Sequence, residues 1–281
     1  NPLTNRIYVG NASSSNVTVI DGSDYTTSTV TVGSGPNDIA VNLITNKIYV
    51  ANFTTNDVTV INGSDNSAPT LAAGARPYAI GVDAVTNKVY CANNLSNNVT
   101  VIDGTYNMTA NVTAGNTPRA VAINPVTNKT YFANYQSHNV TVIDDPTGTT
   151  ATVPTGAWPG DIVVNPITNK IYVGSGANSY VTVIDGADNS TVHVVTGYFP
   201  GSMDVNPVTN KIYVANSSDN KIAIIDGANN SVTNVVIGGT PRYVAVDASA
   251  NKIYVGDYDG NYVTAIDGKN NAFVHINTGL I

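Results

Sequence analysis

The chain has 281 residues, of which 12 are Lys or Arg and 19 are acidic, and only 11% are charged, against about 25% in an average soluble domain. A net charge of −7 argues against a nucleic-acid partner, whose phosphates require a basic face, and no apolar run reaches the ~18 residues of a membrane-spanning helix. Every acidic residue is Asp, and Asn and Thr number 39 and 34. We therefore predict an all-β protein with many short strands and tight turns, without membrane insertion.

A repeat of constant length runs through the whole chain. Its most regular member is a tyrosine that returns every 41 residues, at Tyr8, Tyr49, Tyr90, Tyr131, Tyr172, Tyr213 and Tyr254. The phrases around this tyrosine also return without insertions. A period of this length points to stacked or radially arranged units.

Each unit contains four short predicted strands. In the second unit they are residues 38–41, 47–51, 57–61 and 70–73, separated by turns rich in Asn, Gly and Ser. Four strands about every 40 residues are typical of a propeller blade. The sequence therefore predicts one seven-bladed β-propeller domain over residues 1–281, with four-stranded antiparallel blades. The blades span 1–35, 36–76, 77–117, 118–158, 159–199, 200–240 and 241–281.

The first blade departs from this scheme. Asn1 aligns with Asn42 and Ile281 with Gly35, so the equivalents of residues 36–41 are absent. We expect blade 1 to lack its innermost strand and to expose an edge. Either the polypeptide beyond these ends or a neighbouring chain supplies the strand, and the second case would make the edge a self-assembly site.

Two repeated phrases carry a family resemblance. The stretch Ile-Tyr-Val-Ala-Asn at 212–216 and the stretch Asn-Val-Thr-Val-Ile-Asp-Gly at 98–104 resemble the YVTN family of β-propeller repeats, known from surface-layer and secreted proteins. The resemblance covers the whole chain and implies the propeller fold. It implies little about function, since propellers of this type also include lactonases, lyases and cofactor-dependent dehydrogenase subunits.

Positions that repeat in every unit are predicted to serve the turns. An Asn precedes the second strand in all seven units, and an Asp, or once Asn62, ends the third strand. Both residue types cap their own backbone in turns. One carboxylate per turn falls short of a calcium site, and we predict no metal.

Variation concentrates on the other end of the blades. In an antiparallel meander, the turns between second and third strands share one end with the connections between blades. These turns and connections together are called the variable face. Aromatic side chains and Arg gather there, which favours binding of a glycan or a protein partner. The predicted ligand-binding residues are Trp158, Tyr198, Phe199, Tyr78, Arg76, Arg119, Arg242, Tyr243 and Tyr135.

Three aspartates are predicted to border the central channel. Asp38 and Asp161 occupy equivalent positions, as do Arg119 and Arg242, and Asp204 replaces a small residue. A carboxylate there must be hydrated, paired or bound to a cation. These residues define an alternative, a channel-centred lactonase or lyase. No nucleophile with its base is visible, so we predict neither catalytic residues nor a cofactor, and favour a non-catalytic module. A surface-layer or filament unit is a third reading.

The three histidines and the single cysteine do not form a cluster. His193 and His275 share one repeat position and are predicted to face solvent, whereas His138 lies in a variable turn. The single Cys91 forms no intrachain disulfide.

Thirteen Asn-x-Ser/Thr sequons occur, against about 7 from chance at this composition. The candidate glycosylation sites are Asn16, Asn52, Asn98, Asn139 and Asn216. Together with a surface poor in Lys, they lead us to expect an extracellular or cell-surface location.

Overall fold

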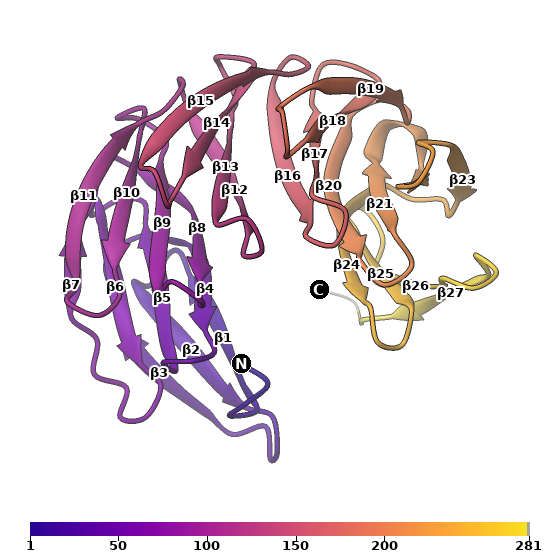
Figure 1. Ribbon diagram of the computed structural model, residues 1–281. Helices are drawn as coiled ribbons and strands as arrows, with labels where there is room; N and C mark the ends of the chain where they lie inside the picture. Colours follow the sequence, from indigo (N-terminus) through magenta and orange to yellow (C-terminus); the bar gives the residue numbers. More distant parts are fainter. Residues whose placement is uncertain (280–281) are drawn as a thin grey trace. The chain divides into compact units, whose positions relative to one another are not determined.

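The computed structural model describes residues 1–279 (Figure 1), so the Leu280–Ile281 end of the last repeat lies outside the described residues. The chain divides into two compact units. Unit 1 comprises residues 1–137 and 141–150, and unit 2 comprises residues 138–140 and 151–281. The two units are described separately below.

The strands repeat in groups of four. First strands are β4 (Pro36–Asn42), β8 (Pro77–Asp83), β12 (Pro118–Asn124), β16 (Pro159–Asn165), β20 (Pro200–Asn206) and β24 (Pro241–Asp247). Second strands are β1 (Arg6–Asn11), β5 (Lys47–Asn52), β9 (Lys88–Asn93), β13 (Lys129–Asn134), β17 (Lys170–Ser175), β21 (Lys211–Asn216) and β25 (Lys252–Asp257). Third strands are β2 (Asn16–Asp21), β6 (Asp57–Asn62), β10 (Asn98–Asp103), β14 (Asn139–Asp144), β18 (Tyr180–Asp185), β22 (Lys221–Asp226) and β26 (Tyr262–Asp267). Fourth strands are β3 (Thr27–Thr31), β7 (Thr70–Ala72), β11 (Met108–Thr113), β15 (Thr149–Pro154), β19 (Thr191–Val195), β23 (Val232–Val236) and β27 (Phe273–Asn277).

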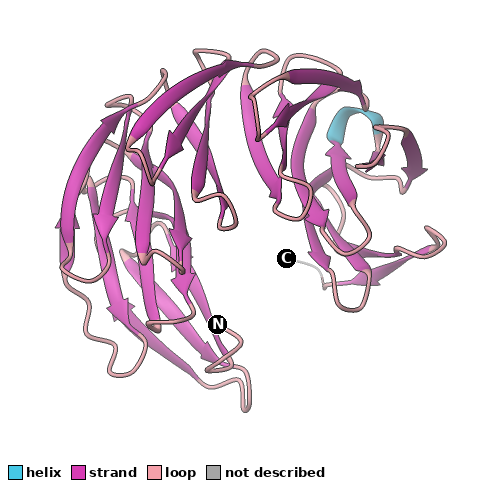
Figure 2. Cartoon of the chain, viewed as in Figure 1, coloured by secondary structure: helices cyan, strands magenta, loops and turns pink. Residues whose placement is uncertain are grey.

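Each group forms one antiparallel sheet whose strands pair in chain order. Six sheets have four strands, and the sheet of blade 1 has three among the described residues, in the order β1-β2-β3. The prediction of an all-β, seven-bladed propeller with a 41-residue repeat is confirmed, as is the incomplete first blade. Figure 2 shows the short 3₁₀ turn η1 (Ser217–Asp219). No helix among the described residues is long and apolar enough to cross a membrane.

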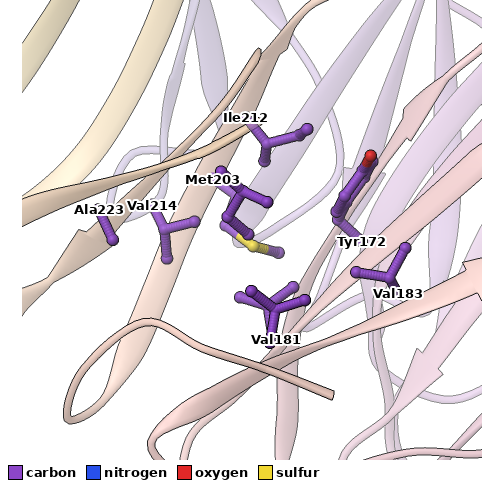
Figure 3. Packing of buried hydrophobic residues seen from close by; sticks show 9 residues of the cluster. Tyr172, Val181, Val183, Met203, Ile212, Val214 and Ala223 are labelled. Carbon is purple, nitrogen blue, oxygen red and sulfur yellow. The ribbon is translucent and has the colours of Figure 1, made fainter. Parts of the chain in front are cut away.

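The second and third strands form the core because neighbouring blades cover both of their faces. In unit 2, Tyr172, Val181 and Val183 of one blade pack against Met203 and Ile212 of the next, and all are buried. Figure 3 shows the Met203 thioether between them. Burying an aliphatic side chain of this size contributes about 1.5–3 kcal/mol. This packing explains why the repeat has apolar residues at consecutive rather than alternate positions.

Polar side chains also join neighbouring blades. The buried hydroxyl oxygen of Thr100, at the centre of β10, accepts the N–H of Gly74 in the connection from the previous blade at 3.1 Å. A Cβ on Gly74 would meet Asn98 Oδ1 and Ser96 Oγ at 2.5 Å. The Thr of the repeated Val-Thr-Val phrase and the repeated Gly of the preceding connection therefore hydrogen-bond to each other, and this bond recurs between successive blades.

The predicted turn-capping roles are confirmed. The Asn before each second strand has a positive φ, for example 53° at Asn46 and 55° at Asn87, a conformation that Asn tolerates better than most residues. Asp103 Oδ1 accepts the N–H of Thr105 at 2.8 Å, and this bond holds the pKa of the Asp103 carboxyl below its usual value. Asn62 makes the equivalent contact to Ser64.

Candidate functional site

Each blade connection is held between two turns of the variable face. The N–H of Ala75 donates to Ser96 Oγ of the following blade at 2.9 Å, and the N–H of Arg76 donates to Asn56 Oδ1 of the preceding blade at 2.8 Å. The same pair of contacts recurs at Asn116 and Thr117. The connections and the second–third turns therefore lie together and form a supported surface.

The residue before the proline of a connection adopts left-handed backbone geometry. Gly35 has a φ of 69°, and at the equivalent positions Arg76, Thr117, Trp158 and Phe199 have φ values between 55° and 59°. Residues other than Gly, Asn or Asp pay roughly 1–2 kcal/mol for this conformation. Arg76, Trp158 and Phe199 therefore place large side chains at a position where the left-handed backbone raises the free energy of the folded state. Gly35 occupies the same position without that cost.

A β-bulge places the residue after the proline. In β12 the pairing partners move from Pro118–Asn134 to Ala120–Ala133, so Arg119 is the unpaired extra residue, and β8 shifts in the same way around Tyr78. Bulges re-aim side chains at functional sites. Here they direct the side chains of Tyr78 and Arg119 to the variable face.

These residues form a continuous ladder of rings and guanidinium groups across three blades of unit 1. The Cζ of Arg76 lies 5.2 Å from the Phe53 ring centroid, and the Phe53 and Tyr78 rings meet edge-on at 6.3 Å. The Cζ of Arg119 lies 5.8 Å from the Tyr78 centroid and 3.7 Å from that of Tyr135. We call Arg76, Phe53, Tyr78, Arg119 and Tyr135 the Arg–aromatic ladder. Both cations are within cation–π range of a ring.

In unit 2 the predicted binding residues are more scattered. Tyr198 and Phe199 are 68% and 53% exposed, and neither has a ring or cation contact among the described residues. The Cζ of Arg242 lies 5.0 Å from the Tyr258 ring centroid, while Tyr243 is exposed.

Trp158 is anchored through its backbone. Its N–H donates to His138 Nδ1 at 3.0 Å, so His138 takes the part that Asn56 plays for Arg76. His138 therefore acts as a turn residue that accepts a hydrogen bond through its ring.

The three aspartates predicted to border a channel serve as inter-blade ties. Asp161 Oδ2 accepts the N–H of Met203 at 2.7 Å and its Oδ1 accepts the N–H of Ile162 at 2.9 Å. Asp38 makes the same two contacts, to Ile80 and to its own neighbour in the chain. Burial raises the pKa of Asp161 to about 6, because desolvation outweighs the two hydrogen bonds.

Asp204 is satisfied by backbone donors. Its carboxylate accepts the N–H groups of Val246 and Val205 at 2.7 and 2.8 Å. The Val246 donor belongs to the next blade. Burial raises its pKa above the usual value.

The outer-strand histidines also have partners. His193 Nδ1 lies 3.2 Å from Thr182 Oγ1, and its ring lies 4.3 Å from the Tyr180 ring. His275 repeats this arrangement with Thr264 and Tyr262. Their side chains thus pack on the third strand of their own blade, although both residues are exposed.

Two of the five candidate glycosylation sites are inaccessible in the fold. Asn52 and Asn216 are 0% exposed, and Asn52 Nδ2 donates to Asp57 Oδ1 and Thr59 Oγ1 at 2.6 and 2.8 Å. A glycan on either amide requires the side chain to leave this buried position, so Asn52 and Asn216 are the least accessible of the five candidates. Asn16, Asn98 and Asn139 are partly exposed and stay predictions.

No group of three or more His, Cys, Asp or Glu residues that could hold a metal ion occurs within residues 1–279. Cys91 is free and fully buried in β9. Burial raises the pKa of its thiol, which keeps it protonated.

Sequence reasoning missed Asn94, which occupies in blade 3 the turn position of Phe53 and Tyr135. Its N–H donates to the carbonyl of Arg76 at 2.9 Å, and its buried Nδ2 has no acceptor. The sequence signal that could have identified Asn94 is that the residue type at this turn position varies between blades.

Comparisons with known proteins identify the fold. No protein-family model matches this chain, and no curated protein matches it. Among solved structures it is similar to Kuenenia stuttgartiensis hydrazine synthase, with a TM-score of 0.72 and 18% identity over 99% of this chain and 93% of that one. It is also similar to dihydro-heme d1 dehydrogenase NirN in complex with DHE, with a TM-score of 0.82 and 14% identity over 99% of this chain and 65% of that one. At these identities the likeness shows a shared β-propeller fold alone.

Proposed function

We propose that this protein is a non-catalytic binding module of the extracellular space or cell surface, and that its variable face binds a glycan or a protein partner. The observation that carries the proposal is the Arg–aromatic ladder, in which bulges and left-handed backbone present rings and cations together. Rigid aromatic side chains and Arg are the residue types that dominate binding sites. The resemblance to YVTN repeats supports the surface location.

The repeat supplies variants for the test that suit the local backbone. Asn37 occupies in blade 2 the bulge position of Tyr78 and Arg119, so Tyr78→Asn with Arg119→Asn should remove the ladder and leave the fold intact. The control is Tyr25→Asn with Arg6→Gln, at the opposite end of blade 1. Tyr25 is exposed, has a φ of 61°, and corresponds to Asn66 in the next blade.

Binding of partners retrieved from a glycan array and from surface extracts should be lost in the ladder variant and retained in the control. Circular dichroism of both variants verifies that they are folded. Unchanged binding by a folded ladder variant would exclude the Arg–aromatic ladder as the binding site. The exposed set Trp158→Ala, Tyr198→Ala and Phe199→Ala provides the same comparison for unit 2.

A second candidate function is structural. Strand β1 pairs only with β2 among the described residues, and an unpaired strand edge is a template for pairing with another chain. Self-assembly through this edge would suit a surface-layer or filament unit. Gly10→Pro, which removes a backbone donor from the unpaired side of β1, should abolish concentration-dependent assembly in light scattering if the edge carries it.

A lactonase or lyase centred on Asp38, Asp161 and Asp204 has no observation in its favour. Both oxygens of each carboxylate accept backbone N–H groups.

A further inference from the structure

Two arginines of unit 1 are not paired with any carboxylate among the described residues. Lys forms ion pairs with Asp within residues 1–279, as in Lys170–Asp185 at 2.6 Å and Lys252–Asp267 at 2.9 Å. Arg76 and Arg119 instead face aromatic rings. Because the chain contains 19 Asp, this arrangement does not reflect a shortage of carboxylates.

The same surface contains two buried donors without acceptors. Arg119 Nε and Asn94 Nδ2 are inaccessible and make no hydrogen bond. Asn94 lies beside Arg76, whose carbonyl accepts its backbone N–H. A buried donor without a partner is costly. Both unsatisfied groups are donors, so the side chains under this surface add no acceptor that would compete with an anionic ligand for the guanidinium groups.

The ladder holds its guanidinium groups in a defined orientation. The Arg119 guanidinium lies against the Tyr135 ring at 3.7 Å and also faces Tyr78. A planar group held on a ring keeps its N–H edge free for a carboxylate, which it binds through two parallel hydrogen bonds. Arg76 provides the second cation. The equivalent residue in the preceding blade connection is Gly35.

We propose that the Arg–aromatic ladder binds an acidic polysaccharide, with uronate carboxylates on Arg76 and Arg119 and sugar rings against the aromatic faces. This inference rests on the proposed binding function of the variable face and specifies its ligand. A polyuronate presents ring-borne carboxylates next to apolar C–H faces, matching guanidinium groups that alternate with rings across three blades. An acidic peptide carries its carboxylates on flexible stems without such faces.

The test compares polygalacturonate with its fully methyl-esterified form, which has the same sugar backbone without the charge. Titration calorimetry should show binding of polygalacturonate and an affinity for the ester at least about tenfold lower. The affinity for polygalacturonate should also fall with added salt, because the contact is ionic.

Variants locate the contact. Arg119→Asn should weaken polygalacturonate binding at least about tenfold. Arg119→Lys should also weaken it, since Lys keeps the charge but loses the planar fork. Arg76→Gly, which restores the residue type of Gly35, should weaken binding without loss of stability. Arg6→Gln, whose side chain contacts Gly63 at the other end of the blades, should leave binding unchanged.

Several outcomes would overturn the proposal. Equal affinity for the methyl ester would indicate a neutral-glycan site, and preference for polyaspartate would indicate an acidic protein partner; either result rejects the polyuronate and leaves the proposed function standing. Failure to bind polygalacturonate, alginate and hyaluronate would reject it equally. Polyuronate binding that survives in folded Arg119→Asn and Arg76→Gly proteins would instead refute the ladder as the site, and the proposed function would then depend on the residues of the variable face in unit 2.

Discussion

The carboxylate of Asp161 accepts the backbone N–H of Met203, a residue of the next blade, at 2.7 Å. The two residues are 42 positions apart, and Asp38 with Ile80 and Asp204 with Val246 show the same spacing. Each tie exchanges the hydration of a carboxylate for hydrogen bonds to the neighbouring blade.

This tie makes stability depend on pH. Since burial raises the pKa of Asp161 from 3.8 to about 6, the folded state binds the proton more tightly than the unfolded state. The contribution to the free energy of unfolding is therefore fully present below about pH 4 and is lost as pH rises to about 6, by at most about 3 kcal/mol. In Asp161→Asn, the free energy of unfolding should fall less between pH 4 and pH 7. Urea denaturation at several pH values measures this.

Asp188→Asn is the matched control for Asp161→Asn. Asp188 is exposed, and its hydrogen bonds with Ser190 lower its pKa. The contribution of Asp188 to the free energy of unfolding is present at neutral pH and is lost as pH falls. This pH dependence is opposite to that of Asp161. A pH profile of Asp161→Asn identical to that of the unmodified protein would contradict the role of Asp161.

Two repeat tyrosines should respond differently to loss of the hydroxyl. Tyr90 donates its hydroxyl to Asp145 Oδ2, so Tyr90→Phe should lower the free energy of unfolding by about 1–3 kcal/mol. The Tyr172 hydroxyl is buried without a partner among the described residues, and desolvation raises its pKa to about 12. Tyr172→Phe should be neutral or stabilising by up to about 1 kcal/mol. Equal losses in thermal unfolding would contradict this distinction.

Left-handed geometry at Phe199, with a φ of 56°, predicts a gain for glycine. Phe199→Gly should be more stable than Phe199→Ala by about 1 kcal/mol, because alanine keeps the Cβ that opposes this conformation. Differential scanning calorimetry of the two variants measures this difference directly. Alanine equal to or more stable than glycine would show that the backbone there is unstrained.

His138 should be replaceable by asparagine. Asn56 and Asn97 occupy its position in the two preceding blades and accept the equivalent N–H groups of Arg76 and Thr117. His138→Asn should therefore stay within about 0.5 kcal/mol of the unmodified protein, whereas His138→Ala should lose about 1 kcal/mol, since the N–H of Trp158 loses its acceptor. Chemical denaturation of both variants provides the comparison, and equal effects would rule out the hydrogen bond as the function of His138.

The repeat was sufficient to predict the blades because their determinants are local. The Asn before each second strand and the Asp or Asn at the end of each third strand act within a few residues of the chain, so Asn46 and Asp103 could be assigned to turns. The aromatic and arginine members of the variable face were also visible, since they break the repeat. Glycosylation at Asn52 could not be judged, because the sequon motif carries no information on burial.

The amino-acid sequence alone determined the period, the four-stranded blades, the incomplete first blade and the end of the blades where variation gathers. Only the tertiary structure decided how those variable residues meet. The bulge at Arg119, the left-handed backbone at Arg76 and the tie from Asp161 to Met203 each depend on the fold. Arg119 and Tyr135 meet at 3.7 Å because a bulged strand and a turn converge in space, and side-chain identity alone does not specify such convergence.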